Sequence, residues 1–359
     1  GVFHGVVHAA DNPHARLGRA AALELERALA GLAAHTAALQ WSRGLLRLAP
    51  GVDVSALQQL VDALRLPADY VQALGAAQAS AVAGLPLASA AWWYPGGGAL
   101  SPAGLCAALL ASAGAACTLR LGQHVAALRR TGSSWVAESG EGQPLARAPV
   151  VVLAHAPAVQ QLAPLRHWPV TPVRGQAQRV PRGDLPLRVA LAGTGYVSAA
   201  PDGWLHFGAT STEGDDDDAV RSADSHANVE RLHALLGDAW PAGTLPLLND
   251  DTSHARAGVR WQSRDRLPLI GALPDDAAAA SAPRGEQPRF VPRQAGLYCF
   301  AAPGSRGIAW SVYGARVLAA WVTGAPFAIE ADLRDALDPA RFAARARRLP
   351  TSAHQERET

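Results

Sequence analysis

The pattern that constrains this chain most is an apolar strand that passes through a glycine-rich turn into a helix, near the C-terminus. Leu297 to Ala301 is apolar, Pro303 to Gly307 reads Pro-Gly-Ser-Arg-Gly, and an apolar helical periodicity follows. Such a junction leaves backbone N–H groups free at the positive end of the helix, which suits an anionic or electron-rich ligand. The junction can also be only a packing device, because glycine permits close approach and positive φ.

A second stretch lies just upstream, where residues 257–271 read AGVRWQSRDRLPLIG. Arg260, Asp265, Pro268 and Gly271 give the spacing Arg-x(4)-Asp-x-x-Pro-x-x-Gly. Together the two stretches resemble the closing segment of the D-amino-acid-oxidase-like flavoproteins, in which the glycine-rich turn lies against the flavin ring. The segment LRDALDPARF, residues 333–342, narrows the resemblance to the oxidoreductase half of bifunctional enzymes that modify wobble uridine in tRNA.

The resemblance implies an α/β, D-amino-acid-oxidase-like FAD/NAD(P)-binding fold with an interleaved antiparallel-sheet substrate domain. We expect residues 1–36, 95–168 and 256–345 to form the FAD-binding domain, residues 37–94 and 169–255 the substrate domain, and residues 346–359 a disordered tail. No G-x-G-x-x-G occurs in the sequence, although dinucleotide-binding domains normally carry it. The opening residues match the family just after its first βαβ unit. We therefore expect an N-terminally truncated, incomplete Rossmann-like domain, with a methyltransferase domain further upstream.

Apolar periodicity and turn residues predict the elements of this fold. Ser55 and Ser101 are plausible helix N-caps, the glycines at 96–98 read as a turn, and the polar stretch 274–294 reads as a mobile loop. The continuous apolar run from Ala148 to Ala156 fits a central parallel strand that is buried on both faces. The predicted helices cover residues 15–32, 55–64, 69–84, 102–113, 224–236 and 339–348, and the predicted strands cover residues 40–48, 90–94, 117–129, 134–139, 148–156, 170–180 and a hairpin at 194–210.

Composition excludes several classes of protein. The net charge of +2 gives no global case for nucleic-acid binding, although a local basic face would suffice. Three distant cysteines indicate neither a disulfide framework nor a zinc site. His4 and His8 could share a metal only on a helix, which Gly5 disfavours, so no metal site is expected. Without an apolar run of about 20 residues or a signal peptide, we expect a cytoplasmic protein, and we expect a monomer.

The resemblance also implies the chemistry. FAD would remove a hydride from a carbon attached to nitrogen, and water would hydrolyse the resulting imine. The implied substrate is the 5-carboxymethylaminomethyl group of tRNA wobble (2-thio)uridine, which would become 5-aminomethyl(2-thio)uridine with release of glyoxylate. The residues expected beside FAD are Val125, Ala154, Gly304, Ser305, Arg306, Gly307 and Ile308.

Two residues are candidates for substrate binding. Arg260 stands where the family binds a carboxylate, for which a planar guanidinium is suited; a structural ion pair with Asp251 or Asp265 is the alternative. Tyr196 could contact the substrate or simply cap the sheet as a buried tyrosine. No histidine or carboxylate need act as a general base.

Several alternatives stay open. The chain could be a glycine or D-amino-acid oxidase that acts on a free amino acid, or a non-catalytic fragment unable to hold FAD. Arg341, Arg345, Arg347 and Arg348 form a cluster that is expected to be a solvated helix face, with RNA contact as the alternative. The acidic run from Asp215 to Asp218 is expected to be a solvated loop rather than a cation site.

Overall fold

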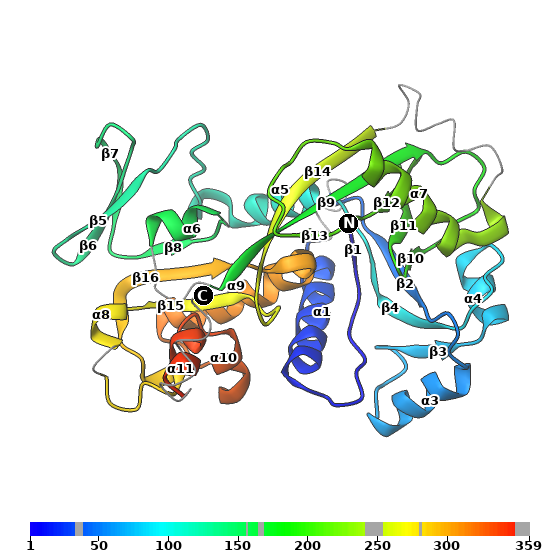
Figure 1. Cartoon of the computed structure of the whole chain (residues 1–359), viewed down its shortest axis with the longest axis horizontal. Helices are drawn as coiled ribbons and strands as arrows, with labels where there is room; N and C mark the ends of the chain where they lie inside the picture. The colour runs from blue at the N-terminus through cyan, green and yellow to red at the C-terminus, as the bar shows by residue number, and fades with distance from the viewer. Residues whose placement is uncertain (33–38, 156, 164–168, 241–253, 280–281, 349–359) are drawn as a thin grey trace, which may run out of the picture. The chain divides into compact units, whose positions relative to one another are not determined.

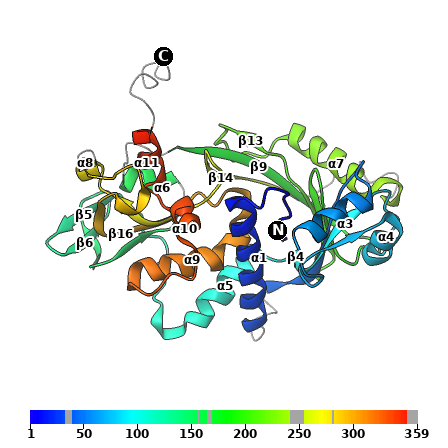
Figure 2. The ribbon, with the colours of Figure 1, turned by 90° about the horizontal axis from the view of Figure 1, so that it is seen from below.

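The computed structural model describes residues 1–32, 39–155, 157–163, 169–240, 254–279 and 282–348 (Figures 1 and 2). The chain divides into two compact units. The first unit combines Gly1–Cys117, Pro172–Val259 and Ile308–Val312, and the second combines Thr118–Thr171, Arg260–Gly307 and Tyr313–Thr359. Each unit is thus assembled from segments that are far apart in the sequence.

A ten-stranded, mostly antiparallel sheet is the framework of the first unit. Its main path has the order β1-β4-β2-β10-β11-β12-β9-β13, with β3 paired to β4 and β14 paired to β9. Strands β2 and β10 run parallel, with Leu46 opposite Leu191. The strands are β1 (Val2–Phe3), β2 (Ser42–Leu48), β3 (Gln72–Leu74), β4 (Ala91–Ala99), β9 (Val170–Pro181), β10 (Ala190–Ala192), β11 (Tyr196–Ala199), β12 (Trp204–Gly208), β13 (Thr212–Glu213) and β14 (His254–Ser263).

Several helices of the first unit begin at residues whose side chains cap them. Asn12 Oδ1 accepts a hydrogen bond from Ala15 N at 3.1 Å, and Ser101 Oγ accepts one from Gly104 N at 3.1 Å. Such a cap satisfies one of the N–H groups that lack a partner within the helix. The helices are α1 (Pro13–Gly31), α3 (Val54–Ala63), α4 (Ala76–Ala83), α5 (Pro102–Ala113) and α7 (Ser222–Leu236), with short 3₁₀ turns η2 (Gly114–Ala116) and η3 (Gly237–Ala239).

Helix α7 packs on the sheet of the first unit, against β11 and β12 (Figure 1). Val229, Leu232 and Leu236 of the helix are buried in one cluster with Leu191 and Phe207 of the sheet. Each fully buried apolar side chain of this size contributes about 1.5–3 kcal/mol. The hydrophobic core of the first unit therefore lies between α7 and the strands.

A buried arginine also joins α7 to the sheet. Arg174 on β9 is fully buried and forms an ion pair with Asp224 in the first turn of α7. Its guanidinium also donates to the Ala219 carbonyl and, at 3.2 Å, to Gln176 Oε1. Because a buried charge is tolerated only when it is paired and hydrogen-bonded, this network fixes α7 on β9.

The second unit contains two three-stranded sheets, with the orders β15-β16-β8 and β5-β6-β7. Strands β8 and β16 run parallel, while β15 and β16 are antiparallel, with Leu269 opposite Ala301. Leu269, Leu297 and Cys299 are at the centre of its core. The elements are β5 (Ala127–Thr131), β6 (Ser134–Glu138), β7 (Pro144–Ala148), β8 (Val151–Leu153), β15 (Leu269–Pro274), β16 (Arg293–Ala301), α6 (Pro157–Leu162), α8 (Asp276–Ala279), α10 (Ala331–Leu337), α11 (Arg341–Arg348), η5 (Pro288–Phe290) and η6 (Gly304–Arg306). Helix α9 (Gly307–Thr323) is divided, because its residues Ile308–Val312 belong to the first unit.

Most long elements lie where the periodicity predicts them, including the strands β2 and β9, the β11–β12 hairpin and the helices α1, α5 and α7. The N-cap of α3 differs, because Asp53 and not Ser55 accepts the capping hydrogen bond, from Ser55 N at 2.7 Å. The single helix predicted over residues 69–84 is wrong. Gly75 has an extended conformation there and separates the strand β3 from the helix α4.

The glycines at 96–98 are part of strand β4 and do not form a turn. A Cβ atom at Gly96 would meet the carboxylate of Glu26 on α1, which would have to move aside. The predicted strand at 117–129 is shorter than expected, since only Ala127–Thr131 is extended into a strand. The stretch 274–294, predicted to be a loop, contains α8 and η5.

The run from Ala148 to Ala156 is not a long strand that is buried on both faces. Strand β8 has three residues, lies at the end of the described β15-β16-β8 order, and leaves the Val152 side chain 41% exposed. Among the described strands, β8 therefore pairs on one edge, with β16. Apolar composition alone therefore overestimated its burial.

The division into two units does not assign a flavin or a substrate role. The FAD-binding segments at 1–36, 95–168 and 256–345 and the substrate segments at 37–94 and 169–255 stay predictions. Of the predicted disordered tail, residues 346–348 belong to the helix α11, so the prediction is wrong for them, and residues 349–359 lie outside the described residues. No helix within the described ranges is long and apolar enough to cross a membrane.

Candidate functional site

The glycine-rich turn forms a sharp, accessible junction between β16 and α9. Ala302 has a φ of 52° and Gly304 a φ of 59°, and both values lie in the left-handed region. Ser305 and Arg306 are exposed. No side chain caps the N-terminus of α9, and its first turn contains no acidic residue. The positive end of this helix can therefore accept an electron-rich ligand.

The end of β14 lies directly beside this turn. Gln262 and Pro303 form an isolated antiparallel bridge, and a Cβ atom at Gly304 would lie 3.4 Å from Gln262 Oε1. Residues two apart on a strand share a face, so Arg260 lies on the face of β14 that Gln262 turns toward Gly304. Arg260 is half-buried there. The structure thus brings the predicted carboxylate-binding arginine and the predicted flavin-side turn onto one face.

Asp265 follows β14 and is held by two arginines. Arg341 donates to its carboxylate from Nη2 at 2.8 Å and from Nε at 2.9 Å, and Arg345 Nη1 donates at 2.6 Å. Burial alone would raise the pKa of Asp265, but the hydrogen bonds and charges of Arg341 and then of Arg345 outweigh it and hold the pKa well below its usual range. Asp251, the other acidic neighbour considered for Arg260, lies outside the described residues.

The arginine cluster at the C-terminus is a solvated helix face only in part: Arg345, Arg347 and Arg348 are exposed, as predicted, and Arg341 is not. Arg341 is 1% exposed, so it is not part of a solvated helix face, and its guanidinium is not accessible to RNA. Arg347 donates to the Ala279 and Ala282 carbonyls at 2.8 and 2.9 Å, and Arg348 donates to the Glu286 carbonyl at 2.7 Å. Periodicity could not reveal this role, because it reports spacing along α11 and not the residues that pack against it.

The other residues expected beside FAD are more scattered. Ala154 is exposed and directly follows β8, which runs parallel to β16, so it lies at the strand end from which the glycine-rich turn also departs. Ile308 is half-buried in the first turn of α9. Val125 is half-buried just before β5 and does not lie in a strand.

Tyr196, the second predicted substrate residue, belongs to the first unit. It begins β11, where it is opposite Gly208 and Ala192 in the neighbouring strands. It is half-buried against a core cluster that includes Leu45 and Tyr94. This packing is also what a tyrosine that caps the sheet would show, so both interpretations of Tyr196 stay open.

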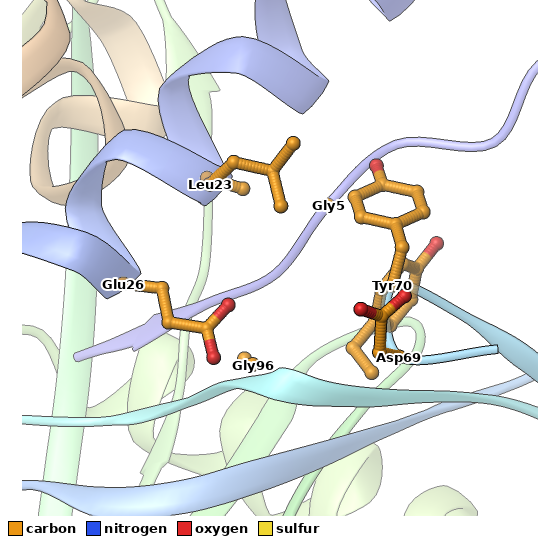
Figure 3. Close-up of a pocket in the computed structure, with 9 residues that line it drawn as sticks. Gly5, Leu23, Glu26, Asp69, Tyr70 and Gly96 are labelled. Carbon is orange, nitrogen blue, oxygen red and sulfur yellow. The ribbon is translucent and has the colours of Figure 1, made fainter. Parts of the chain in front are cut away.

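A shallow pocket of the first unit was not predicted from the sequence (Figure 3). Its wall includes the carboxylates of Glu26 on α1 and Asp69, with Tyr70 and Gly96 beside them. Glu26 Oε1 accepts a hydrogen bond from Arg43 Nη2 at 2.5 Å. Two carboxylates repel a carboxylate or phosphate ligand, so this pocket does not suit an anionic substrate group. No sequence motif marks these residues.

The acidic run is organised by an arginine. Arg221 donates to Asp215 Oδ2 at 2.5 Å and to Asp217 Oδ2 at 2.7 Å. The hydrogen bond from Arg221 lowers the pKa of Asp215 below its usual value. Among the described residues, no group of three or more His, Cys, Asp or Glu side chains has an arrangement that could hold a metal ion.

Comparisons with known proteins agree with this geometry. Residues 1–321 match the family described as FAD dependent oxidoreductase, or DAO. The chain is 41% identical over 359 residues to the tRNA 5-methylaminomethyl-2-thiouridine biosynthesis bifunctional protein MnmC of Methylibium petroleiphilum, which covers 96% of this chain and 53% of that protein. The protein of the same name from Burkholderia vietnamiensis is 42% identical over 356 residues, with coverages of 97% and 54%. The chain spans about half the length of these curated relatives.

Solved structures show the same fold. Glycine oxidase from Geobacillus kaustophilus superposes with a TM-score of 0.70 at 23% identity, covering 90% of this chain and 82% of that one. L-proline dehydrogenase from P. horikoshii superposes with a TM-score of 0.72 at 14% identity, covering 96% and 86%. The predicted D-amino-acid-oxidase-like α/β fold is confirmed by these likenesses.

Proposed function

This chain belongs to the family of FAD-dependent oxidoreductases, and we propose that it oxidises the side chain of the wobble uridine in tRNA. The proposed substrate is the 5-carboxymethylaminomethyl group. Oxidation of its carbon–nitrogen bond and hydrolysis with one water would leave 5-aminomethyl(2-thio)uridine on the tRNA and release glyoxylate. Two electrons and two protons would leave the substrate for the flavin, so that the reaction balances.

One observation carries the proposal. Identity near 41% extends over 96% of the chain to relatives named for 5-methylaminomethyl-2-thiouridine biosynthesis in tRNA. The family match over residues 1–321 spans Arg260 and the glycine-rich turn. Because these relatives are about twice as long as this chain, the tRNA substrate and the methyltransferase partner domain stay proposals.

The residues of the second unit fit the ring end of FAD. The donor set consists of backbone N–H groups at an uncapped helix N-terminus, with the exposed Ser305 and Arg306 beside them. Such a set favours an electron-rich ring over a cationic one. FAD, when bound, would supply the oxidising chemistry, since the protein carries no group of its own that accepts a hydride. The sequence has no G-x-G-x-x-G, so no residues are assigned to the pyrophosphate.

Arg260 is the residue that we propose for the substrate carboxylate. Its guanidinium can form two parallel hydrogen bonds with a carboxylate, which fixes the orientation of the group as well as its position. Its place on the face of β14 that meets Gly304 supports binding beside the flavin ring. Binding the carboxylate there would orient the neighbouring carbon–nitrogen bond for oxidation.

The remaining proposed contacts of FAD and of the substrate are the following. Gly304, Ser305, Arg306, Gly307 and Ile308 would lie against the flavin ring, and Val125 and Ala154 elsewhere along FAD. Tyr196 is a further proposed contact of the substrate. The proposal includes no general base, because proton loss from the amine does not require a dedicated side chain.

The test uses tRNA that carries carboxymethylaminomethyl(2-thio)uridine and the purified full-length protein with bound FAD. Nucleoside analysis should find the aminomethyl product, and glyoxylate should appear in equal amount. Turnover of free glycine with no turnover of the tRNA would instead assign the protein to the oxidases of small amino acids. A chain that never binds FAD would leave neither activity possible.

A further inference from the structure

We propose that Arg341 is a positioning residue for the flavin-side turn, acting through Asp265 and the end of β14. The inference rests on the proposed placement of the flavin ring against Gly304 to Gly307. Arg341 lies 37 positions after Gly304 and would not touch FAD or substrate itself. All of the residues concerned lie in the second unit.

Asp265 organises the tight turn between β14 and β15. Its Oδ1 accepts hydrogen bonds from Ser263 Oγ at 3.0 Å and from Leu267 N at 3.4 Å. Arg266, inside the turn, has a φ of 59°. A non-glycine residue in this region is strained by about 1–2 kcal/mol, so surrounding contacts must hold the turn in this shape.

Arg341 supplies those contacts from α11. Besides the two hydrogen bonds to Asp265, its Nη2 donates to the Leu267 carbonyl at 2.8 Å and its Nη1 to the Pro268 carbonyl at 3.1 Å. Nη1 also lies 3.2 Å from the Leu337 carbonyl, at the end of α10. The planar guanidinium therefore fastens the β14–β15 turn to the C-terminal helices, an arrangement that lysine could not reproduce.

The β14–β15 turn connects Arg341 to the glycine-rich turn through the two strands that it joins, β14 and β15. On one side, Gln262 is the residue before the last of β14. It forms the bridge to Pro303 and packs against Gly304. On the other side, Leu269 follows the carbonyls that Arg341 holds and pairs with Ala301, at the end of β16. Both strands that flank the glycine-rich turn are thus anchored next to the same guanidinium.

A second buried ion pair in this unit provides a matched control. Arg293 donates to both carboxylate oxygens of Asp338 at 2.7 Å and to the Ala272 carbonyl at 2.9 Å. Asp338 is fully buried, as Arg341 nearly is. Arg293 lies at the far end of β16 from the glycine-rich turn. Its loss should destabilise the unit to a similar extent and leave the turn in place.

The experiment compares Arg341→Met and Arg293→Met in the full-length FAD-bound protein, without tRNA. The dissociation constant of FAD and the reduction potential of the bound flavin are measured beside the melting temperature. We expect both variants to have a lower melting temperature than the wild type. Only Arg341→Met should weaken FAD binding, by about tenfold, and shift the potential by about 30 mV, which for two electrons is tenfold in relative affinity.

Equal effects of the two variants on FAD, in step with their loss of stability, would overturn the proposal. If Arg341→Met does not fold, Asp265→Asn keeps the size of the side chain and should weaken FAD binding in the same direction. An unchanged potential in Asp265→Asn would equally count against it. Gly304→Val separates this result from failure of the proposed site, since normal FAD binding in that variant would mean that the flavin ring lies elsewhere.

Discussion

The guanidinium of Arg341 donates two hydrogen bonds to the carboxylate of Asp265, from Nη2 to Oδ1 at 2.8 Å and from Nε to Oδ2 at 2.9 Å. The two residues are 76 positions apart in the sequence. Asp265 belongs to the motif RDRLPLIG and Arg341 to the motif LRDALDPARF. The two most distinctive motifs of the chain are therefore joined in one buried ion pair.

This pair predicts a specific dependence of stability on pH. The pKa of Asp265 is lower in the folded chain than its unfolded value of about 3.9. Its stabilisation is therefore fully present above pH 4 and is lost as the pH falls toward the folded pKa. We expect the free energy of unfolding of the wild type to exceed that of Asp265→Asn by a constant amount from about pH 6 to 8, with the gap closing in acid. Urea titrations at several pH values measure this gap, and a gap that is as large at about pH 2 as at pH 7 would contradict the assignment.

Arg260 should matter for the substrate and little for the fold. Arg260→Ala removes a bidentate, charge-assisted pair, so kcat/KM for the modified tRNA should fall about 10- to 100-fold, corresponding to about 1.5–3 kcal/mol. Arg256→Ala is the control, because Arg256 is exposed on the same strand. Equal activity losses in both variants would mean that Arg260 acts only through the general charge of β14.

Gly304 can be tested against a glycine at the other end of the same helix. Gly304 has a φ of 59° at the start of α9, and Gly324 has a φ of 72° at its C-cap. Alanine at either position should cost about 1 kcal/mol of stability, because both lie in the left-handed region. Only Gly304→Ala should alter the visible spectrum of the bound flavin. A spectrum that changes in Gly324→Ala as well would show that the helix as a whole, and not the turn, is responsible.

Arg174 should be a major contributor to the stability of the first unit. Arg174→Met leaves Asp224 without its buried partner, and we expect a loss of about 3–5 kcal/mol in the free energy of unfolding. Arg179 lies on the same strand and stacks over Trp204, with its guanidinium 4.5 Å from the ring centroid. Arg179→Met should cost no more than about 1 kcal/mol. Denaturant unfolding of both variants gives the comparison, and equal losses would refute the importance of the buried pair.

The sequence was sufficient for the fold class and for the long elements. Apolar periodicity predicts α7, because Val229, Leu232 and Leu236 fall on one side, and alternation predicts β9 and the β11–β12 hairpin. The glycine-rich turn was also predicted, since its residues are consecutive. Patterns of this kind can be read from the sequence because each one lies within a single segment of the chain.

Long-range partners could not be predicted from the same patterns. The arginines of α11 look like a solvated face in the sequence, yet Arg341 is buried because a residue 76 positions away supplies its partner. Gly96 looks like a turn residue, but it lies within strand β4, next to the carboxylate of Glu26 on α1. Strand β8 looks fully buried, because its composition does not report how many strands lie beside it.

The most direct test of the proposed function is an anaerobic titration of the FAD-bound full-length protein, followed by the visible absorbance of the flavin. We predict that tRNA with carboxymethylaminomethyl(2-thio)uridine bleaches the flavin, while unmodified tRNA and free glycine do not. Bleaching by glycine alone would contradict the account and indicate an oxidase of free amino acids.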